Sequence, residues 1–164
     1  PLSGIELSVA LLTKMINEIE YLTCFKIESA NAASKIRALI KNCSSRLDAP
    51  FDGEESITLY ADLEAGISGS MSSALLPEKI APVIDHFWNN EKDKAEEVYN
   101  GILPLINFEN RQCGFRATKT VMKEGGVIKS DFCRDPIKPL DLDTKNLLLN
   151  FAKRYDLLTY KWGK

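Results

Sequence analysis

Helical and strand patterns alternate along the first half of this chain, and this alternation limits its possible folds more than any other feature. Apolar residues recur at helical spacing in three segments, 12–19, 33–43 and 57–64. Three short segments have the composition of strands, 21–27, 47–51 and 66–71. Pro50 interrupts the second of these, because proline cannot donate a ladder hydrogen bond. Helix followed by strand, three times over, predicts parallel strands joined by right-handed helical crossovers.

The second half of the chain has the pattern of helices alone. Amphipathic spacing predicts helices over 80–87, 95–105 and 116–124, and Gly125-Gly126 ends the last of these. Asp141 or Asp143 is expected to cap a final helix that turns Leu147, Leu148 and Phe151 inward. Three strands are few for a sheet and leave open edges. We therefore expect a fold class of α/β that is only part of a larger architecture.

Composition excludes several classes of function. The 21 basic and 23 acidic residues form no basic run, which argues against a nucleic-acid partner. The longest apolar runs are far too short to cross a membrane, so we expect a soluble, cytoplasmic protein. The four cysteines contain no C-x-x-C pair, and we expect Cys24 and Cys43 to be reduced and buried. With His86 as the one histidine, no metal site is predicted.

Lys26 is the unusual residue of the first predicted strand, because it stands between Phe25 and Ile27 in a segment expected to be buried. Two interpretations are open. The lysine is either an edge residue that points to solvent, or an amine that has been removed from water. Desolvation lowers the pKa of an amine, and the neutral form attacks carbonyl groups.

Two further groups follow predicted strands. Glu54 and Glu55 come directly after Gly53, and they are either first-turn acids of a helix or ligand contacts at a strand end. Gly69 and Ser70 occupy the same place on the next strand. Small residues there are explained either by close packing or by a binding site.

These residues occur together in an order that resembles one family. The segments that carry the resemblance are Pro1–Ile5, Phe25–Glu28 with Ser29 and Asn31, Gly53–Glu55, Gly69–Ser70, Gly114–Thr120 and Cys133–Pro136. Their order and spacing are similar to those of the dihydrodipicolinate synthase / N-acetylneuraminate lyase family of class I aldolases and dehydratases. Segments 25–28, 105–112 and 122–128 most resemble its 2-keto-3-deoxy-L-arabonate dehydratases.

The resemblance implies a (β/α)8 TIM barrel, of which residues 1–90 would supply strands six to eight and residues 91–164 a C-terminal helical region. It implies that Lys26 forms an imine with a small 2-oxo acid, with no separate cofactor, and that the protein is a homotetramer. Gly53, Glu54, Glu55, Gly69 and Ser70 would face the distal hydroxyls of the substrate.

The implied function is a Schiff-base lyase that dehydrates a 2-keto-3-deoxy sugar acid such as 2-keto-3-deoxy-L-arabonate. The alternatives are a class I aldolase that releases pyruvate (N-acetylneuraminate-lyase-like or acting on 4-hydroxy-2-oxo acids), a non-catalytic half-barrel and an unrelated α/β interaction domain. Glu54-Glu55-Ser56 departs from the lyase branch, which carries an aromatic residue and then two acids after the glycine. The family's carboxylate-binding loop and proton-relay tyrosine would precede Pro1, so we expect this chain alone to be inactive.

Overall fold

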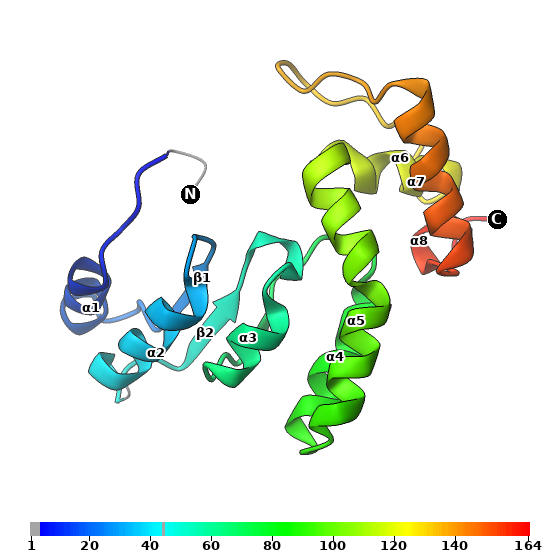
Figure 1. Cartoon of the computed structure of the whole chain (residues 1–164). Helices are drawn as coiled ribbons and strands as arrows, with labels where there is room; N and C mark the ends of the chain where they lie inside the picture. Colours follow the sequence, from blue (N-terminus) through cyan, green and yellow to red (C-terminus); the bar gives the residue numbers. More distant parts are fainter. Residues whose placement is uncertain (1–3, 44) are drawn as a thin grey trace. The chain divides into compact units, whose positions relative to one another are not determined.

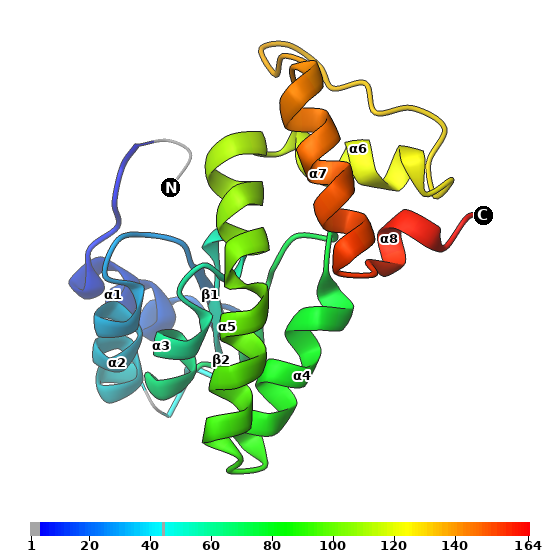
Figure 2. The same ribbon diagram turned by 45° about the vertical axis from the view of Figure 1, so that its right-hand side comes forward.

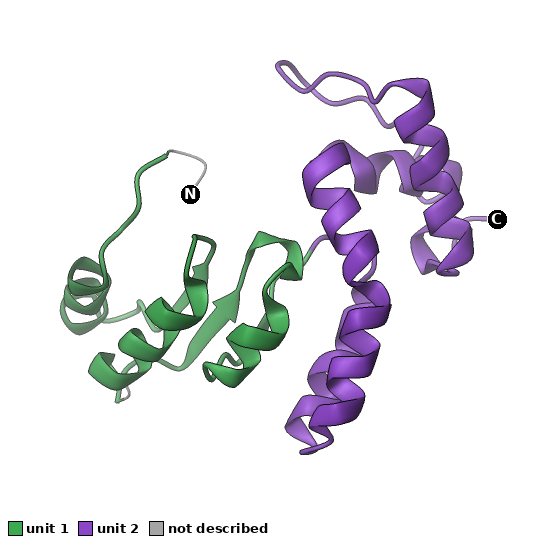
Figure 3. Cartoon of the chain, viewed as in Figure 1, with its two compact units in different colours: residues 1–72 green, residues 73–164 purple. Residues whose placement is uncertain are grey.

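A computed structural model describes residues 4–43 and 45–164 of the chain, so Pro1 to Ser3, which begin the first family-like segment, lie outside it. Contacts divide the chain into unit 1, residues 1–72, and unit 2, residues 73–164 (Figures 1 and 3). Helix α4 (Pro77–Trp88) groups with unit 2 because it packs along α5 (Lys92–Phe108). From the sequence, a boundary is expected after residue 90, between the barrel and the C-terminal helical region of the family, and that boundary stays a prediction.

Unit 1 alternates helices and strands, as the sequence predicts. Its elements are α1 (Val9–Glu18), β1 (Cys24–Ile27), α2 (Ala32–Cys43), β2 (Ala49–Asp52), the short turn η1 (Glu54–Ser56), α3 (Leu59–Glu64) and β3 (Gly69–Ser70). The three strands are parallel and lie in the order β1-β2-β3. The predicted α/β class with parallel strands is therefore confirmed.

The helices of unit 1 form where an apolar stripe can be buried. Ser8 caps α1 by accepting a hydrogen bond from the Leu11 amide at 3.2 Å, and Leu12 and Ile16 of that helix are buried. Helix α2 buries Ile36 and Leu39 and contacts both β1 and β2. Helices α2 and α3 run side by side (Figure 2). The core of unit 1 thus lies between these helices and one face of the sheet.

Pro50 lies in the central strand, and the hydrogen-bond pattern explains why it is tolerated. Its carbonyl accepts a hydrogen bond from the Ser68 amide at 2.8 Å, so its own missing N–H lies on the same side of β2. That side faces residues that precede β3, which begins at Gly69. Proline therefore removes no rung from the described ladder.

Unit 2 is helical. Besides α4 and α5 it contains the π-helical segment η2 (Glu109–Cys113), α6 (Arg116–Glu124), α7 (Leu142–Arg154) and α8 (Leu158–Lys161). The four helices predicted from periodicity are confirmed, and Asp141 caps α7 by accepting from the Thr144 amide at 2.9 Å. Leu148 is buried as expected. The inward orientation of Leu147 is wrong, because it lies on the solvent side of α7.

The environment of the cysteines differs in part from expectation. All four are free, and Cys43 is buried in α2 as predicted. The prediction for Cys24 is wrong: it is exposed at the start of β1, which pairs with β2 alone among the described strands. No helix within residues 4–43 and 45–164 has both the length and the apolar character that crossing a membrane requires.

Candidate functional site

Lys26 lies on β1 and is paired in register with Phe51 of β2. Its side chain is 33% exposed, and its Nζ lies 3.1 Å from Glu28 Oε2. Of the two interpretations of this lysine, the described chain favours the one in which its side chain is partly open to solvent. Burial alternates along β1: Phe25 and Ile27 lie on the more buried face of the sheet, and Lys26 lies on the opposite, exposed face.

Gly53 follows β2 and lies directly against the lysine. A β-carbon at this position would be 2.7 Å from the Ile27 carbonyl oxygen, 2.8 Å from Glu28 Cβ and 3.0 Å from Lys26 Cε. Backbone oxygen cannot move aside as a flexible side chain can. Only glycine therefore allows the end of β2 to approach the lysine so closely.

The acidic residues after Gly53 form a left-handed turn. Glu54, Glu55 and Ser56 have φ values of 47°, 54° and 67°. The left-handed conformation costs a residue with a side chain roughly 1–2 kcal/mol. The turn is thus a strained segment that its surroundings must hold, and it precedes α3 as a separate element. The interpretation of Glu54 and Glu55 as first-turn acids of a right-handed helix is therefore wrong.

Glu55 lies within electrostatic reach of the lysine. Burial raises the pKa of Glu55, the positive charge of Lys26 opposes this, and the negative charge of Glu28 adds to it. The structure therefore brings Lys26 of β1 together with Gly53 and Glu55, which follow β2.

A pocket of about 270 Å³ adjoins the lysine. Its lining comes from the N-terminal segment, α1, β1, the residues after β1, and α2: Glu6, Leu7, Leu12, Phe25, Lys26, Ile27, Glu28, Ser29 and Lys35. Lys35 Nζ donates hydrogen bonds to Glu6 Oε1 at 2.7 Å and to the Leu7 carbonyl at 3.0 Å. The pocket thus holds two ammonium groups, and Lys26 is the one that the strand positions.

Gly69 and Ser70 do not both belong to this arrangement. Gly69 is paired with Phe51 and packs against its ring, on the face of the sheet that carries Lys26. Ser70 is paired with Asp52 and lies on the opposite face, where its hydroxyl donates to Asp52 Oδ2 at 2.6 Å. The hydroxyl of Ser70 is therefore engaged away from the lysine, and its contact with a substrate stays a prediction.

Sequence reasoning missed a pair of buried acids. Asp52 ends β2 and Asp62 lies in α3, and neither side chain is exposed. Burial raises the pKa of Asp52 to about 7, opposed by the Ser70 hydroxyl and reinforced by Asp62. Burial likewise raises the pKa of Asp62. An acid beside a glycine at a strand end is read as a loop residue, so the sequence carried no signal of its burial.

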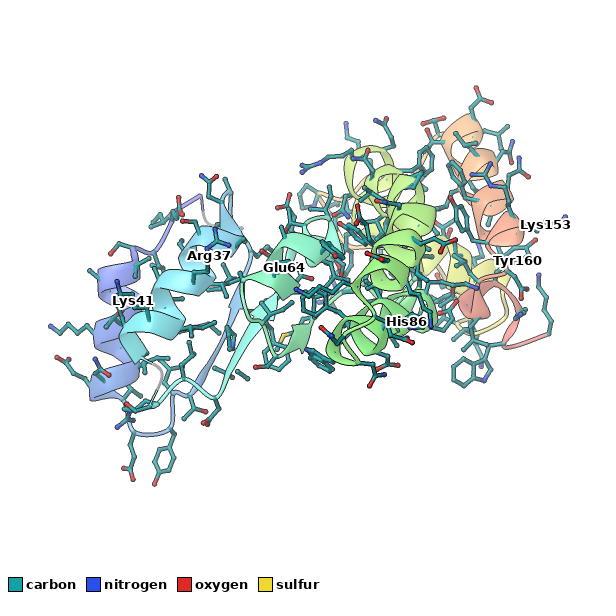
Figure 4. All side chains as sticks on the ribbon, turned by 60° about the horizontal axis from the view of Figure 1, so that its bottom comes forward. Arg37, Lys41, Glu64, His86, Lys153 and Tyr160 are labelled. Carbon is teal, nitrogen blue, oxygen red and sulfur yellow. The ribbon has the colours of Figure 1, made fainter. Side chains whose placement is uncertain are left out.

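Metal and histidine chemistry have little basis in the described residues. No group of three or more His, Cys, Asp or Glu side chains in residues 4–43 and 45–164 is arranged to hold a metal ion. His86 projects from α4 in unit 2 (Figure 4), and its Nδ1 lies 2.6 Å from Glu91 Oε2. His86 is thus partnered by a surface carboxylate.

Comparison with known proteins gives one family throughout. The sequence model of the dihydrodipicolinate synthetase family matches residues 1–154. The chain is 44% identical over 163 residues to L-2-keto-3-deoxyarabonate dehydratase of Azospirillum brasilense, which covers 99% of this chain and 53% of that protein. The chain therefore spans about half the length of this curated relative.

Solved structures agree on the fold. Dihydrodipicolinate synthase from Rhodopseudomonas palustris superimposes with a TM-score of 0.82 at 21% identity, covering 90% of this chain and 50% of that one. The enzyme from Aquifex aeolicus gives a TM-score of 0.82 at 21% identity, covering 93% and 51%. Because these structures are only 21% identical to this chain, the similarity concerns the fold alone.

Proposed function

Because this chain belongs to the dihydrodipicolinate synthetase family, we propose that it carries the imine-forming lysine, Lys26, of a lyase that acts on small 2-oxo acids. The proposed reaction is the dehydration of a 2-keto-3-deoxy sugar acid such as 2-keto-3-deoxy-L-arabonate. The observation that carries this choice is the 44% identity to a protein named for that reaction, extending over 99% of the chain. The substrate in that protein's name is a 2-oxo acid. A lysine amine can form an imine with the carbonyl group of such an acid.

The proposed architecture is a (β/α)8 barrel in which β1, β2 and β3 are strands six, seven and eight. The parallel order of the strands and the TM-scores above support it. Catalytic groups of such barrels come from the carboxyl ends of the strands, which is where Lys26, Gly53 and Glu55 meet. A cytoplasmic homotetramer that needs no separate cofactor belongs to the same proposal.

The mechanism begins with the neutral amine of Lys26. Its Nζ attacks the C2 carbonyl of the substrate, and the carbonyl oxygen leaves as water to give a protonated imine. The cationic nitrogen draws electrons from C3, so a C3 proton is lost and an enamine forms. The enamine expels the C4 hydroxyl, which is protonated as it leaves as a second water. Loss of a C5 proton and protonation at C3 then convert the unsaturated imine into an enol, whose hydroxyl proton moves to C4 to give the C5 aldehyde. Hydrolysis of the imine consumes one water and frees Lys26, so the net change is the loss of one water.

Two carboxyl groups of the site have parts in this sequence. Glu28, 3.1 Å from the amine, pairs with the lysine at rest and suits the base that takes its proton, which leaves the neutral amine free to attack. Glu55 suits the proton donor to the leaving C4 hydroxyl, because its raised pKa favours the protonated acid. An acid in this position distinguishes dehydration from cleavage of the C3–C4 bond, which needs a base at the same hydroxyl.

Product analysis tests the proposal. The protein in its natural full length is incubated with 2-keto-3-deoxy-L-arabonate, and the products are identified by mass spectrometry. A 2-oxo acid semialdehyde is expected, whereas pyruvate would mean an aldolase, and no turnover by folded protein would contradict both. Lys26→Arg keeps the charge but cannot form an imine, so turnover should be abolished. Lys35→Arg makes the same change at the other lysine of the pocket and should leave turnover in place.

A further inference from the structure

A hydrogen-bonded chain of polar side chains lies on the face of the sheet opposite to Lys26. Ser70 donates to Asp52 Oδ2 at 2.6 Å, and the Ser56 and Ser70 hydroxyls are 2.7 Å apart. Because Ser70 donates to Asp52, the Ser70 oxygen can accept from Ser56, and Ser56 also lies within hydrogen-bonding reach of Asp52 itself. On the other side, Thr58 donates to Asp62 Oδ2 at 2.8 Å. Each aspartate therefore uses one carboxyl oxygen to accept from a hydroxyl group.

The second carboxyl oxygen of each aspartate indicates that the pair holds a proton. Asp52 Oδ1 and Asp62 Oδ1 are both buried and have no hydrogen-bond donor while both groups are ionised. The two carboxyls are nevertheless within hydrogen-bonding reach of one another. A buried oxygen without a donor is costly, and two buried like charges in contact are costlier. One proton shared between Asp52 and Asp62 removes both costs.

This pair is connected to the strained turn beside the lysine. Asp52 immediately precedes Gly53, and Ser56, at the end of the left-handed turn, is held through Ser70 to the same carboxyl. The turn is thus fixed at its start by the close packing of Gly53 against Lys26 and at its end by the serine chain. Glu55 lies between these two attachments.

We propose that Asp52 and Asp62 are positioning residues that share one proton and, through Ser70 and Ser56, hold the left-handed turn so that Glu55 stays beside Lys26. The proposal rests on the proposed function of Lys26. It assigns the pair no contact with substrate. Ser70 accordingly acts through its hydroxyl on Ser56 and Asp52.

Loss of the shared proton has a direct consequence for the site. The ionisable and charged groups that face the pair are Glu54 from the turn and Arg37 from α2, which is seen projecting from that helix in Figure 4. Glu54 disfavours a second negative charge on the pair, and the exposed Arg37 favours it from a distance. When both aspartates are ionised their repulsion separates β2 from α3, and the turn between them loses its support. Activity should therefore fall on the alkaline side as the pair loses its proton.

Two substitutions at Asp52 test this account. Asp52→Asn retains an acceptor for Ser70 and supplies a donor to Asp62 at every pH, whereas Asp52→Ala removes both. Asp48→Asn, at the exposed start of the same strand, removes the same charge without touching the pair. We expect kcat to fall on the order of tenfold or more in Asp52→Ala and to stay within about twofold in Asp52→Asn and Asp48→Asn.

The pH profile of kcat is the readout that a merely structural role would leave unchanged. The alkaline limb expected in the wild type and in Asp48→Asn should become shallower or move upward in Asp52→Asn, where only the limb due to the proton donor Glu55 remains. An alkaline limb in Asp52→Asn identical to that of the wild type overturns the proposal, and this comparison does not require Asp52→Ala to fold.

A second measurement separates this proposal from the proposed function. A Glu-specific protease should cut after Glu54 or Glu55 faster in Asp52→Ala, or in Asp62→Ala, than in the wild type or Asp52→Asn. If the wild type turns over no 2-oxo acid, the proposed function fails while the cleavage rates still report on the turn. If the wild type is active, and all variants have its cleavage rate and its pH profile, only the positioning role is wrong.

Discussion

The buried pair makes folding stability depend on pH, and Asp52→Asn isolates that dependence. In the folded chain the pKa of Asp52 is raised from the usual 3.8 to about 7, chiefly by burial. The folded state therefore keeps a proton that the unfolded state releases between about pH 4 and pH 7. The sign follows from linkage: the contribution of Asp52 to the free energy of unfolding is highest at and below pH 4 and falls as pH rises through this window.

The magnitude follows from the same two values. One pKa unit corresponds to about 1.4 kcal/mol, so the contribution of Asp52 to the unfolding free energy should fall by on the order of 4 kcal/mol between pH 4 and pH 8. Asparagine does not titrate and keeps the hydrogen bonds. The unfolding free energy of Asp52→Asn minus that of the wild type should therefore rise by about the same amount over this range.

Urea unfolding at constant ionic strength, followed from pH 4 to pH 8, measures this difference directly. The comparison of variants cancels the titration of groups distant from the pair, so the difference reports on Asp52 together with Asp62. Asp131→Asn is a control, because a hydrogen bond from Lys123 lowers the pKa of Asp131, so the stabilisation by this group is fully present above about pH 4. Its loss should destabilise the fold by a nearly constant amount from pH 4 to pH 8. A difference between Asp52→Asn and the wild type that stays constant with pH would refute the shared proton.

Three further substitutions test the site and the packing. Gly53→Ala should destabilise the fold by about 1–3 kcal/mol and reduce turnover, because the added β-carbon would collide with the Ile27 carbonyl oxygen. Urea denaturation measures the stability and a turnover assay measures the activity; a variant unchanged in both would contradict the close approach of Gly53 to Lys26. Asp141→Ala should cost about 1 kcal/mol in thermal unfolding, since it removes the cap of α7, whereas Asp143→Ala should cost less. Leu148→Ala should cost about 2–5 kcal/mol in urea unfolding and the exposed Leu147→Ala far less; equal costs would contradict the orientation of α7.

The sequence predicted the elements better than the directions of their side chains. Apolar spacing located α1, α2 and the helices of unit 2, and the alternation of elements predicted the parallel sheet. Side-chain direction on a strand depends on register, and a shift of one residue turns every side chain to the other face. Segment 66–71 carries no pattern that fixes this register, so the turning of Ser70 toward Asp52 was not predictable.

The positions of the candidate site residues were predictable from the sequence, but the backbone conformation that holds them was not. The strand ends placed Lys26, Gly53 and Glu55 together because parallel strands bring their carboxyl ends to one edge. The left-handed turn was not foreseen, since Glu54 and Glu55 have no intrinsic preference for positive φ. Such a turn is held by long-range contacts, here those of Ser56 with Ser70, which no local pattern reveals.

The account depends most on the imine at Lys26, and reductive trapping measures it directly. The protein in its natural full length is mixed with 2-keto-3-deoxy-L-arabonate or pyruvate, reduced with borohydride, digested and mapped by mass spectrometry. The account predicts one covalent adduct, on the peptide that contains Lys26, and none on the peptide that contains Lys35. An adduct on another lysine, or folded protein with no adduct at all, would contradict it.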